Sequence, residues 1–349
     1  MNSKLIQTPV DEVRAELPPG DFSALNPDTV LDALFAAGFE CDGRLLALNS
    51  YENRVYQLGL EAGGTVIAKF YRPGRWSDAQ ILEEHAFVAE LAAAELDVVP
   101  ALLNPEGRSL QQLGDFRFAL FRSQGGRAPE LDRAGTLESM GRFLGQLHAI
   151  GSRQPYSHRQ CLTVESFGDA ALRRLMTGNW IPLDLRSSYE STARMMLDEV
   201  RACYQRAGDL PYLRLHGDCH LGNVLTVASA GEATGERFHF LDFDDSCMGP
   251  AMQDLWMLLS GSRSEMQQQM CDILVGYEDF FEFDPRSLHL IEALRSLRLL
   301  HYSAWLALRW QDPAFPLAFP GFALARYWQD KILEMREQIA LMQEPVLRV

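Results

Sequence analysis

The sequence predicts an α+β fold with two lobes: a small β-rich N-terminal lobe and a larger, mostly α-helical C-terminal lobe. The chain has 349 residues, enough for two domains or one large bilobal domain. β-branched and aromatic residues in near alternation dominate up to about residue 121, and helical periodicity dominates after Gly125 and Gly126. We therefore expect an irregular extension over 1–27, an N-terminal lobe over 28–123 and a C-terminal lobe over 124–349.

The N-terminal lobe contains strand-like and helical segments bounded by turn and capping residues. The segments expected in order are a helix over 29–39 with Asp28 as N-cap, strands within 44–61 and 63–73 around a Gly63-Gly64 turn, a helix over 77–96 beginning at Ser77, and strands at 108–112 and 116–121. The stretch 118–123 is expected to link the two lobes.

The C-terminal lobe reads as helices around two short strand regions. We expect helices over 136–150 and 187–207, strands around 213–220 and 237–245 joined by a hairpin over 228–236, and helices from Pro250 onward. The aromatic residues of the C-terminal region fit a packed helical core better than a cage for a cationic ligand.

Composition and charge exclude several classes of protein. Hydrophobic residues make up 47% of the chain and charged residues 23%, as in a globular protein rather than a disordered one. The formal net charge is −15, which disfavours binding to nucleic acid or to an anionic membrane. The six cysteines lie far apart, as expected for free thiols in a reducing compartment. With neither a signal peptide nor a membrane-spanning apolar stretch visible, we expect a cytoplasmic protein. We also expect it to be a monomer.

The segment LHGDCHLGNVL carries the most informative motif. His216, Asp218 and Asn223 have the spacing H-x-D-x-x-x-x-N of a kinase catalytic loop. Asp218 would accept or orient the proton of an attacking hydroxyl, and Asn223 would hold a metal ion on the phosphates. The alternative is a structural turn rich in Asx residues. His216 is expected to brace this loop, and Asp254 to tie a later helix to it.

Two further groups complete a phosphoryl-transfer site. Asp242 follows an apolar strand and could bind Mg²⁺ together with Asn223, with ATP oxygens completing the coordination shell. Lys69, one of three lysines, lies in a half-buried strand and needs an anionic partner. Nucleotide phosphates and a carboxylate of the next helix, Glu84 or Glu83, would supply it. The alternatives are an acidic turn at Asp242 and a lysine extending from an edge strand to solvent.

Occurring together in the order found in kinases, these residues predict phosphoryl transfer from a nucleotide. A nucleotide-binding regulator without catalysis is disfavoured because Lys69, Asp218, Asn223 and Asp242 are all present. A metallohydrolase built on Asp242 and its neighbours would lack enough histidines.

The segments HGDCHLGN and FLDFDD resemble the aminoglycoside phosphotransferase and choline kinase-like family. The segments NSYENRVYQ, AKFYRPGRW, QILEEH, GPAMQDLWMLLSG and DPAFP resemble a narrower group of bacterial stress-response protein kinases. The resemblance implies a bilobal protein-kinase-like fold and an ATP- and Mg²⁺-dependent kinase acting on serine and threonine hydroxyls of protein substrates, itself included. By position it implies that Asp218 is the proton acceptor, Asn223 and Asp242 bind Mg²⁺, Ser50 contacts ATP, and Lys69 pairs with Glu84.

The sequence departs from typical protein kinases in two places. SYENR lacks the glycines of a phosphate-covering loop, so Ser50, Asn53 and backbone amides would take over that role. GPAMQDLW follows Asp242 almost at once, leaving no long activation segment for peptide docking. A small-molecule kinase acting on an amino alcohol or an aminoglycoside-like cation is therefore the alternative function. The net charge of −15 would suit such a cation, and equally a basic polypeptide.

Overall fold

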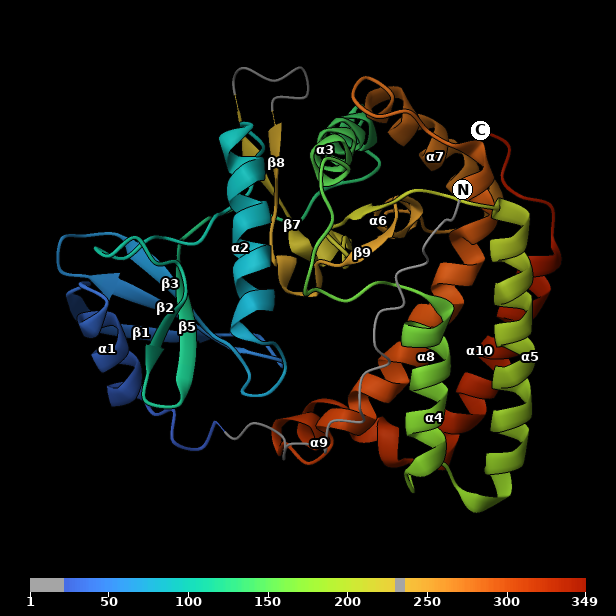
Figure 1. Cartoon of the computed structure of the whole chain (residues 1–349), viewed down its shortest axis with the longest axis horizontal. Coiled ribbons are helices and arrows are strands. Elements are labelled where there is room, and N and C mark those ends of the chain that lie inside the picture. Colours follow the sequence, from blue (N-terminus) through green and yellow to red (C-terminus); the bar gives the residue numbers. More distant parts are fainter. Residues whose placement is uncertain (1–21, 230–235) are drawn as a thin grey trace, which may run out of the picture.

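The computed structural model describes residues 22–229 and 236–349. Figure 1 shows an N-terminal sheet on one side and a helical C-terminal part on the other, with α2 (Asp78–Ala93) between them. This arrangement confirms the predicted α+β fold. Of the irregular extension expected over 1–27, residues 1–21 lie outside the described residues, and α1 (Pro27–Ala36) begins at its last position.

An antiparallel sheet forms the N-terminal lobe, with strand order β1-β2-β3-β5-β4. Its strands are β1 (Cys41–Leu48), β2 (Arg54–Leu60), β3 (Thr65–Phe70), β4 (Gln111–Leu113) and β5 (Phe116–Arg122). Gly63 and Gly64 both have positive φ and form the expected turn between β2 and β3. Lys69 lies on the central strand β3, paired across the sheet with Val55 and Ala119.

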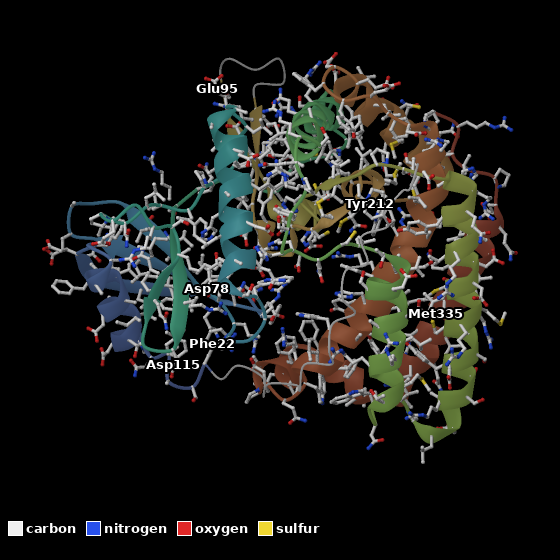
Figure 2. All side chains as sticks on the ribbon, in the orientation of Figure 1. Phe22, Asp78, Glu95, Asp115, Tyr212 and Met335 are labelled. Carbon is white, nitrogen blue, oxygen red and sulfur yellow. The ribbon has the colours of Figure 1, made fainter. Side chains whose placement is uncertain are left out.

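The N-cap predicted for α2 is confirmed, whereas the N-cap predicted for α1 is wrong. Helix α1 is capped by Asn26, whose side chain accepts the Thr29 N–H at 2.9 Å, so Asp28 lies in the first turn instead of at the cap. Helix α2 begins at the expected Ser77, which forms a capping box with Gln80. Figure 2 shows Asp78 at one end of α2 and Glu95 beyond the other.

The strand expected at 108–112 begins later, at Gln111. The Asn104 side chain accepts the backbone N–H groups of Glu106 and Arg108, and this closes a turn where the strand was expected to begin. The long helix expected from 187 begins earlier, at Leu183. Pro182 precedes its first turn, and the Pro182 carbonyl accepts the first hydrogen bonds of the helix.

The C-terminal lobe is a set of packed helices. They are α3 (Thr136–Gly151), α4 (Ala170–Thr177), α5 (Leu183–Ala207), α6 (Met252–Trp256), α7 (Arg263–Tyr277), α8 (Ile291–Arg309), α9 (Ala314–Ala318) and α10 (Ala325–Gln343). A π-helix (Val164–Asp169) precedes α4, and 3₁₀ turns occupy Leu221–Asn223, Phe243–Asp245, Pro285–Leu290 and Pro320–Ala323. Within the described residues, no helix is both long and apolar enough to cross a membrane.

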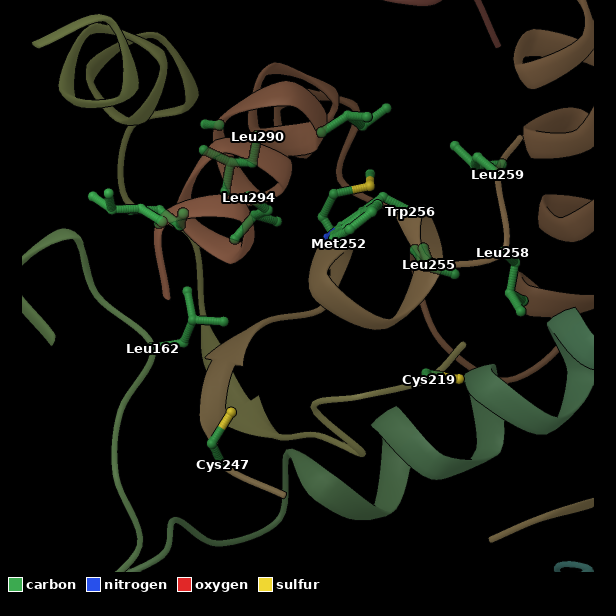
Figure 3. Packing of buried hydrophobic residues seen from close by; sticks show 14 of the residues in the cluster. Leu162, Cys219, Cys247, Met252, Leu255, Trp256, Leu258, Leu259, Leu290 and Leu294 are labelled. Atoms are coloured by element: carbon green, nitrogen blue, oxygen red, sulfur yellow. The ribbon is translucent and has the colours of Figure 1, made fainter. Parts of the chain in front are cut away.

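Four short strands hold the segments that carry the predicted chemistry. β6 (Tyr212–Arg214) pairs with β9 (Met248–Pro250), and β7 (Val224–Ala228) pairs with β8 (Glu236–Phe240). In the hairpin expected over 228–236, residues 230–235 lie outside the described residues. Figure 3 shows α6 side chains together with Cys219 and Cys247, all of which belong to one buried hydrophobic cluster beside these segments.

Candidate active site

A cavity of about 1220 Å³ opens between the N-terminal sheet and the C-terminal helices. Side chains from both lobes line it. All six residues that the sequence predicted for the site are among them: Ser50, Lys69, Glu84, Asp218, Asn223 and Asp242. The fold therefore brings together residues from five separate segments of the chain.

A buried carboxylate on α6 holds the loop that follows β6. Asp254 of α6 accepts the backbone N–H of His216 at 2.8 Å and that of Gly217 at 2.9 Å. The same carboxylate lies 3.2 Å from Nε2 of His148. His216 in turn donates from Nε2 to the Leu241 carbonyl at 2.8 Å. Asp254 and His216 therefore position the loop, as the sequence predicted.

Gly217 explains why this loop reads H-G-D. Its φ is 86°, and a Cβ there would lie 2.2 Å from the carbonyl oxygen of Asp245. Only glycine combines that backbone conformation with such a close approach. The loop after β6 can therefore pass directly against the turn that carries Asp242.

Asp218 projects from this loop toward α8. Its Oδ1 lies 2.5 Å from Nη1 of Arg298, and its Oδ2 lies 3.4 Å from Nε2 of His220. Burial alone would raise the pKa of Asp218, but the hydrogen bond from His220 and the charge of Arg298 hold that pKa well below the usual value. The carboxylate is thus ionised and oriented at neutral pH.

Asn223 and Asp242 lie side by side. The Leu241 N–H donates to the Asn223 carbonyl at 2.8 Å, which places the next residue, Asp242, beside Asn223. Nδ2 of Asn223 donates to the Asp218 carbonyl at 3.0 Å, leaving Oδ1 as an acceptor. The Asp242 side chain is 56% exposed and its φ is 59°, a left-handed conformation uncommon outside glycine. This pair of oxygen donors in the cavity fits a hard divalent cation.

Lys69 makes its ion pairs with the turn that carries Asp242. Nζ lies 3.0 Å from Oδ1 of Asp242 and 3.2 Å from Oδ1 of Asp244. Burial would lower the pKa of Lys69, but Asp242 and Asp244 raise it well above the usual value. Lys69 is therefore charged although it is buried, which is the state needed to bind phosphate oxygens.

Glu84 takes a different partner from the one expected. Its Oε2 lies 2.8 Å from Nη2 of Arg159, and in this structure the expected Lys69–Glu84 ion pair is not formed. The guanidinium of Arg159 reaches Glu84 from the C-terminal lobe, while Lys69 turns to Asp242 and Asp244. Burial raises the pKa of Glu84, and the charges of Lys69 and Arg159 oppose that rise.

The loop between β1 and β2 contains Ser50, which lines the cavity. Asn53, expected to help cover the phosphates, is already engaged. Its Oδ1 accepts the Arg72 N–H at 3.1 Å and its Nδ2 donates to Asp244 at 3.2 Å. Because both ends of the amide are used, Asn53 braces the loop instead.

Three arginines were missed in the sequence. Arg75 pairs with both Asp244 and Asp245, Arg159 with Glu84, and Arg298 with Asp218. Burial would raise the pKa of Asp244, but Arg75 and Lys69 lower it below its usual value. Each of these ion pairs joins residues far apart in the chain, so no local sequence motif predicts the pairing.

The C-terminal aromatic residues divide into two groups. Phe315, Phe322 and Trp328 are buried in the helical core, as expected. Trp305 and Phe319 line the cavity instead. Cys219 and Cys247 are buried next to the site, and burial raises the pKa of both thiols well above the usual value, which keeps them protonated.

Comparison with known proteins agrees with this geometry. The sequence profile of the phosphotransferase enzyme family matches residues 44–291. Stress response kinase A of Escherichia coli (strain K12) is 40% identical over 329 residues, which cover 94% of this chain and 97% of that protein. Serine/threonine protein kinase RdoA of Salmonella typhimurium (strain LT2) is 40% identical over 336 residues, with coverage of 94% and 97%.

A solved structure shows the same fold. The complex of amicoumacin kinase hAmiN with AMP-PNP, Ca²⁺ and Ami superimposes with a TM-score of 0.69 at 20% identity, covering 90% of this chain and 93% of that one. The fold is therefore that of a bilobal kinase, and the protein is a phosphotransferase. With a family match over most of its length and relatives spanning nearly all of it, the chain belongs to the phosphotransferase enzyme family, alongside the stress response kinases.

Proposed function

We propose that this kinase transfers the γ-phosphoryl group of ATP to serine and threonine hydroxyls of proteins, itself included, in a bacterial stress response. The observation that carries the proposal is the 40% identity, over 94% of the chain, to a protein named as a serine/threonine protein kinase. In the transfer, the hydroxyl oxygen bonds to the γ-phosphorus, ADP leaves, and the hydroxyl proton passes to Asp218.

Asp218 is assigned as the proton acceptor because it is ionised, oriented by two side chains and exposed to the cavity. The low pKa of Asp218 makes it a weak base, so orienting the hydroxyl is a large part of its role. Ser50 lies in the loop expected to cover the phosphates. Lys69, charged and buried, would bind phosphate oxygens.

Asn223 and Asp242 are assigned to Mg²⁺. Both offer oxygen atoms to the cavity, and their segments are hydrogen-bonded to each other through Leu241 and Asn223. When bound, Mg²⁺ neutralises phosphate charge and supplies electrostatic stabilisation during transfer. Glu84 contributes indirectly, because its pair with Arg159 ties α2 to the C-terminal lobe.

A small-molecule kinase is the second candidate, and one feature favours it. β9 (Met248–Pro250) and α6 (Met252–Trp256) follow Asp242 directly, where a protein kinase has a long activation segment. The platform that such a segment offers to a peptide is missing from this part of the described chain. A polypeptide acceptor would have to dock on the helices instead.

Labelled ATP distinguishes the two candidates. The purified protein is incubated with γ-labelled ATP and Mg²⁺, alone, with protein acceptors, and with kanamycin, choline or homoserine. We expect label in phosphoserine or phosphothreonine after acid hydrolysis of the protein. Rapid turnover of one of the three small acceptors with no label in protein would contradict the proposal.

A further inference from the structure

Aromatic side chains from both lobes gather on one side of the cavity. Tyr51 belongs to the loop between β1 and β2, Tyr302 and Trp305 belong to α8, and Phe319 directly follows α9. All four line the cavity, and we call them the aromatic cluster. The ring centroid of Phe319 lies 5.1 Å from that of Tyr51 and 5.9 Å from that of Trp305. The centroids of Tyr302 and Trp305 are 5.5 Å apart, so the rings form one continuous surface.

Part of this aromatic surface is open. Tyr51 and Tyr302 are each 38% exposed, and Leu308 of α8, which also lines the cavity, is 37% exposed. Single exposed apolar residues are common on protein surfaces, but several exposed together along a cavity are typical of a binding surface. The aromatic cluster is therefore a candidate for contact with a ligand.

Helix α8 connects the aromatic cluster to the reacting position. Its Arg298 has Nη1 2.5 Å from Oδ1 of Asp218. Tyr302 and Trp305 follow Arg298 at spacings of four and three residues, which places all three on one face of the helix. The helix rises about 10 Å from Arg298 to Trp305, and an extended polypeptide spans that length in about three residues. A polypeptide with its hydroxyl at Asp218 can therefore reach the aromatic cluster.

Charge distinguishes an apolar occupant of the aromatic cluster from a cationic one. In the described chain, each of the five carboxylates that line the cavity already has a cationic partner: Glu52, Glu84, Asp218, Asp242 and Asp245. Glu52 contacts the cluster, since it accepts a hydrogen bond from Trp305 at 2.5 Å. Its counter-charges are Arg72 at 3.1 Å and Arg309 at 2.7 Å. A cation at the rings would lie near these guanidinium groups with no unpaired carboxylate among the five, whereas an apolar side chain gains from burial.

We propose that the aromatic cluster is an acceptor subsite for an apolar side chain, such as leucine, about three residues from the serine or threonine that is phosphorylated. The inference rests on the proposed function, because it describes the acceptor of that same reaction. The apolar side chain covers the exposed rings of Tyr51 and Tyr302 and thereby brings the hydroxyl to Asp218. Helix α8 thus supplies a docking surface for a polypeptide, which the short connection after Asp242 does not offer.

Three peptides test the subsite. Each has one serine and carries leucine, alanine or lysine at the third position on both sides of it, and kcat/KM is measured from ADP release. We expect the wild type to use the leucine peptide roughly 10-fold better than the alanine peptide, as burial of one apolar side chain allows. The lysine peptide should be used no better than the alanine peptide. In Tyr302→Ala, the ratio of kcat/KM for the leucine and alanine peptides should fall to about 1.

Two further variants separate the aromatic ring from other effects. Tyr302→Phe keeps the ring and should keep the leucine preference. Phe280→Ala is the matched control, because Phe280 is 46% exposed in the same lobe and does not line the cavity, so this variant should also keep the preference.

The outcomes distinguish the subsite from the proposed function. Equal use of the leucine and alanine peptides by the wild type, a preference for the lysine peptide, or an unaltered preference in Tyr302→Ala would overturn the apolar subsite and leave the proposed function standing. Absence of phosphate in every peptide and in the protein itself would overturn the proposed function.

Discussion

Asp242 and Asn223 differ in what each offers to a metal ion. Asp242 supplies a charged carboxylate, whereas Asn223 supplies one neutral oxygen because its Nδ2 is bound to the Asp218 carbonyl. Asp242→Ala should therefore abolish Mg²⁺-dependent ATP binding, and Asn223→Ala should weaken it less, because water can replace one neutral ligand.

Calorimetric titration with Mg·ATP measures this difference. Asp115→Ala is the control, since Asp115 is exposed in the β4–β5 turn of the N-terminal lobe, well away from the cavity (Figure 2). If Asp242→Ala bound Mg·ATP as tightly as Asp115→Ala, the assignment of Asp242 to the metal would be wrong.

The sequence predicted individual site residues correctly where they lie at fixed spacing within one loop. His216, Asp218 and Asn223 lie in one short segment, so their order was visible, and Asp254 and His216 have the supporting roles expected of them. The ion partners were not visible. Arg159 and Arg298 reach the site from other elements, and no local pattern relates them to Glu84 or Asp218.

At the scale of elements, α3 and α7 pack so closely that the contact requires glycine. A Cβ on Gly141 would lie 2.0 Å from the backbone oxygen of Ile273. Gly141→Ala should therefore lower the free energy of unfolding by about 1–3 kcal/mol or more, because two helix backbones must separate. This outweighs the gain of up to about 1 kcal/mol that alanine brings to a helix.

Urea unfolding of Gly141→Ala tests this contact, with Gly125→Ala as the control. A Cβ on Gly125 meets nothing within 4 Å, so that variant should match the wild type. Equal stability of the two variants would show that α3 and α7 are not packed as described.

The sequence predicted most elements correctly as helix or strand, and the errors concern the residues at which these elements begin or end. The Gly63-Gly64 turn and the Ser77 cap follow from local chemistry, and both are present. The N-cap of α1 is Asn26 and not Asp28. Both residue types can cap a helix, so the sequence alone does not determine which of the two precedes the first turn. The late start of β4 depends on hydrogen bonds of the Asn104 side chain, which periodicity does not reveal.

For the molecule as a whole, a cluster of charges ties the loop between β1 and β2 to the C-terminal lobe. Glu52 of this loop accepts hydrogen bonds from Trp305 at 2.5 Å and from Arg309 at 2.9 Å, and it pairs with Arg72 at 3.1 Å. Arg72 also reaches Asp312 at 2.8 Å. Glu52→Gln would leave these arginines without their main counter-charge and should cost about 3 kcal/mol of stability at pH 7.

The pH dependence of this loss has a defined sign. Burial would raise the pKa of Glu52, but Arg75 and Arg309 lower it below its usual value. Because the folded-state pKa is depressed, the carboxylate stabilises the fold above the unfolded-state pKa of about 4.3, and this contribution disappears as the pH falls below that value.

Thermal unfolding should therefore show the largest difference between Glu52→Gln and the wild type near pH 7, and a smaller one below about pH 4. Glu106→Gln is the control, because Glu106 is exposed and its contact with Arg108 is 3.7 Å long. A constant difference at all pH values would mean that Glu52 acts through shape and not through charge.

The bilobal architecture was predictable because the switch from alternating to helical periodicity extends over the whole chain. The placement of charged side chains in the cavity was not. Arg75 and Arg298 line the cavity from elements far apart in sequence, although the overall charge is −15. Net charge describes long-range attraction, whereas selection at the site depends on which side chains the fold places there.

Asp218 is proposed to take part in phosphoryl transfer without binding the nucleotide. Asp218→Asn keeps the size of the side chain and removes its charge, so kcat should fall about 10²–10⁴-fold. Nucleotide affinity should stay close to that of the wild type, because Lys69 and Asp242 are unchanged. The decisive measurement is therefore single-turnover transfer from labelled ATP beside nucleotide titration for Asp218→Asn and the wild type. Loss of transfer with retained affinity is the predicted result, and wild-type turnover by Asp218→Asn would contradict it.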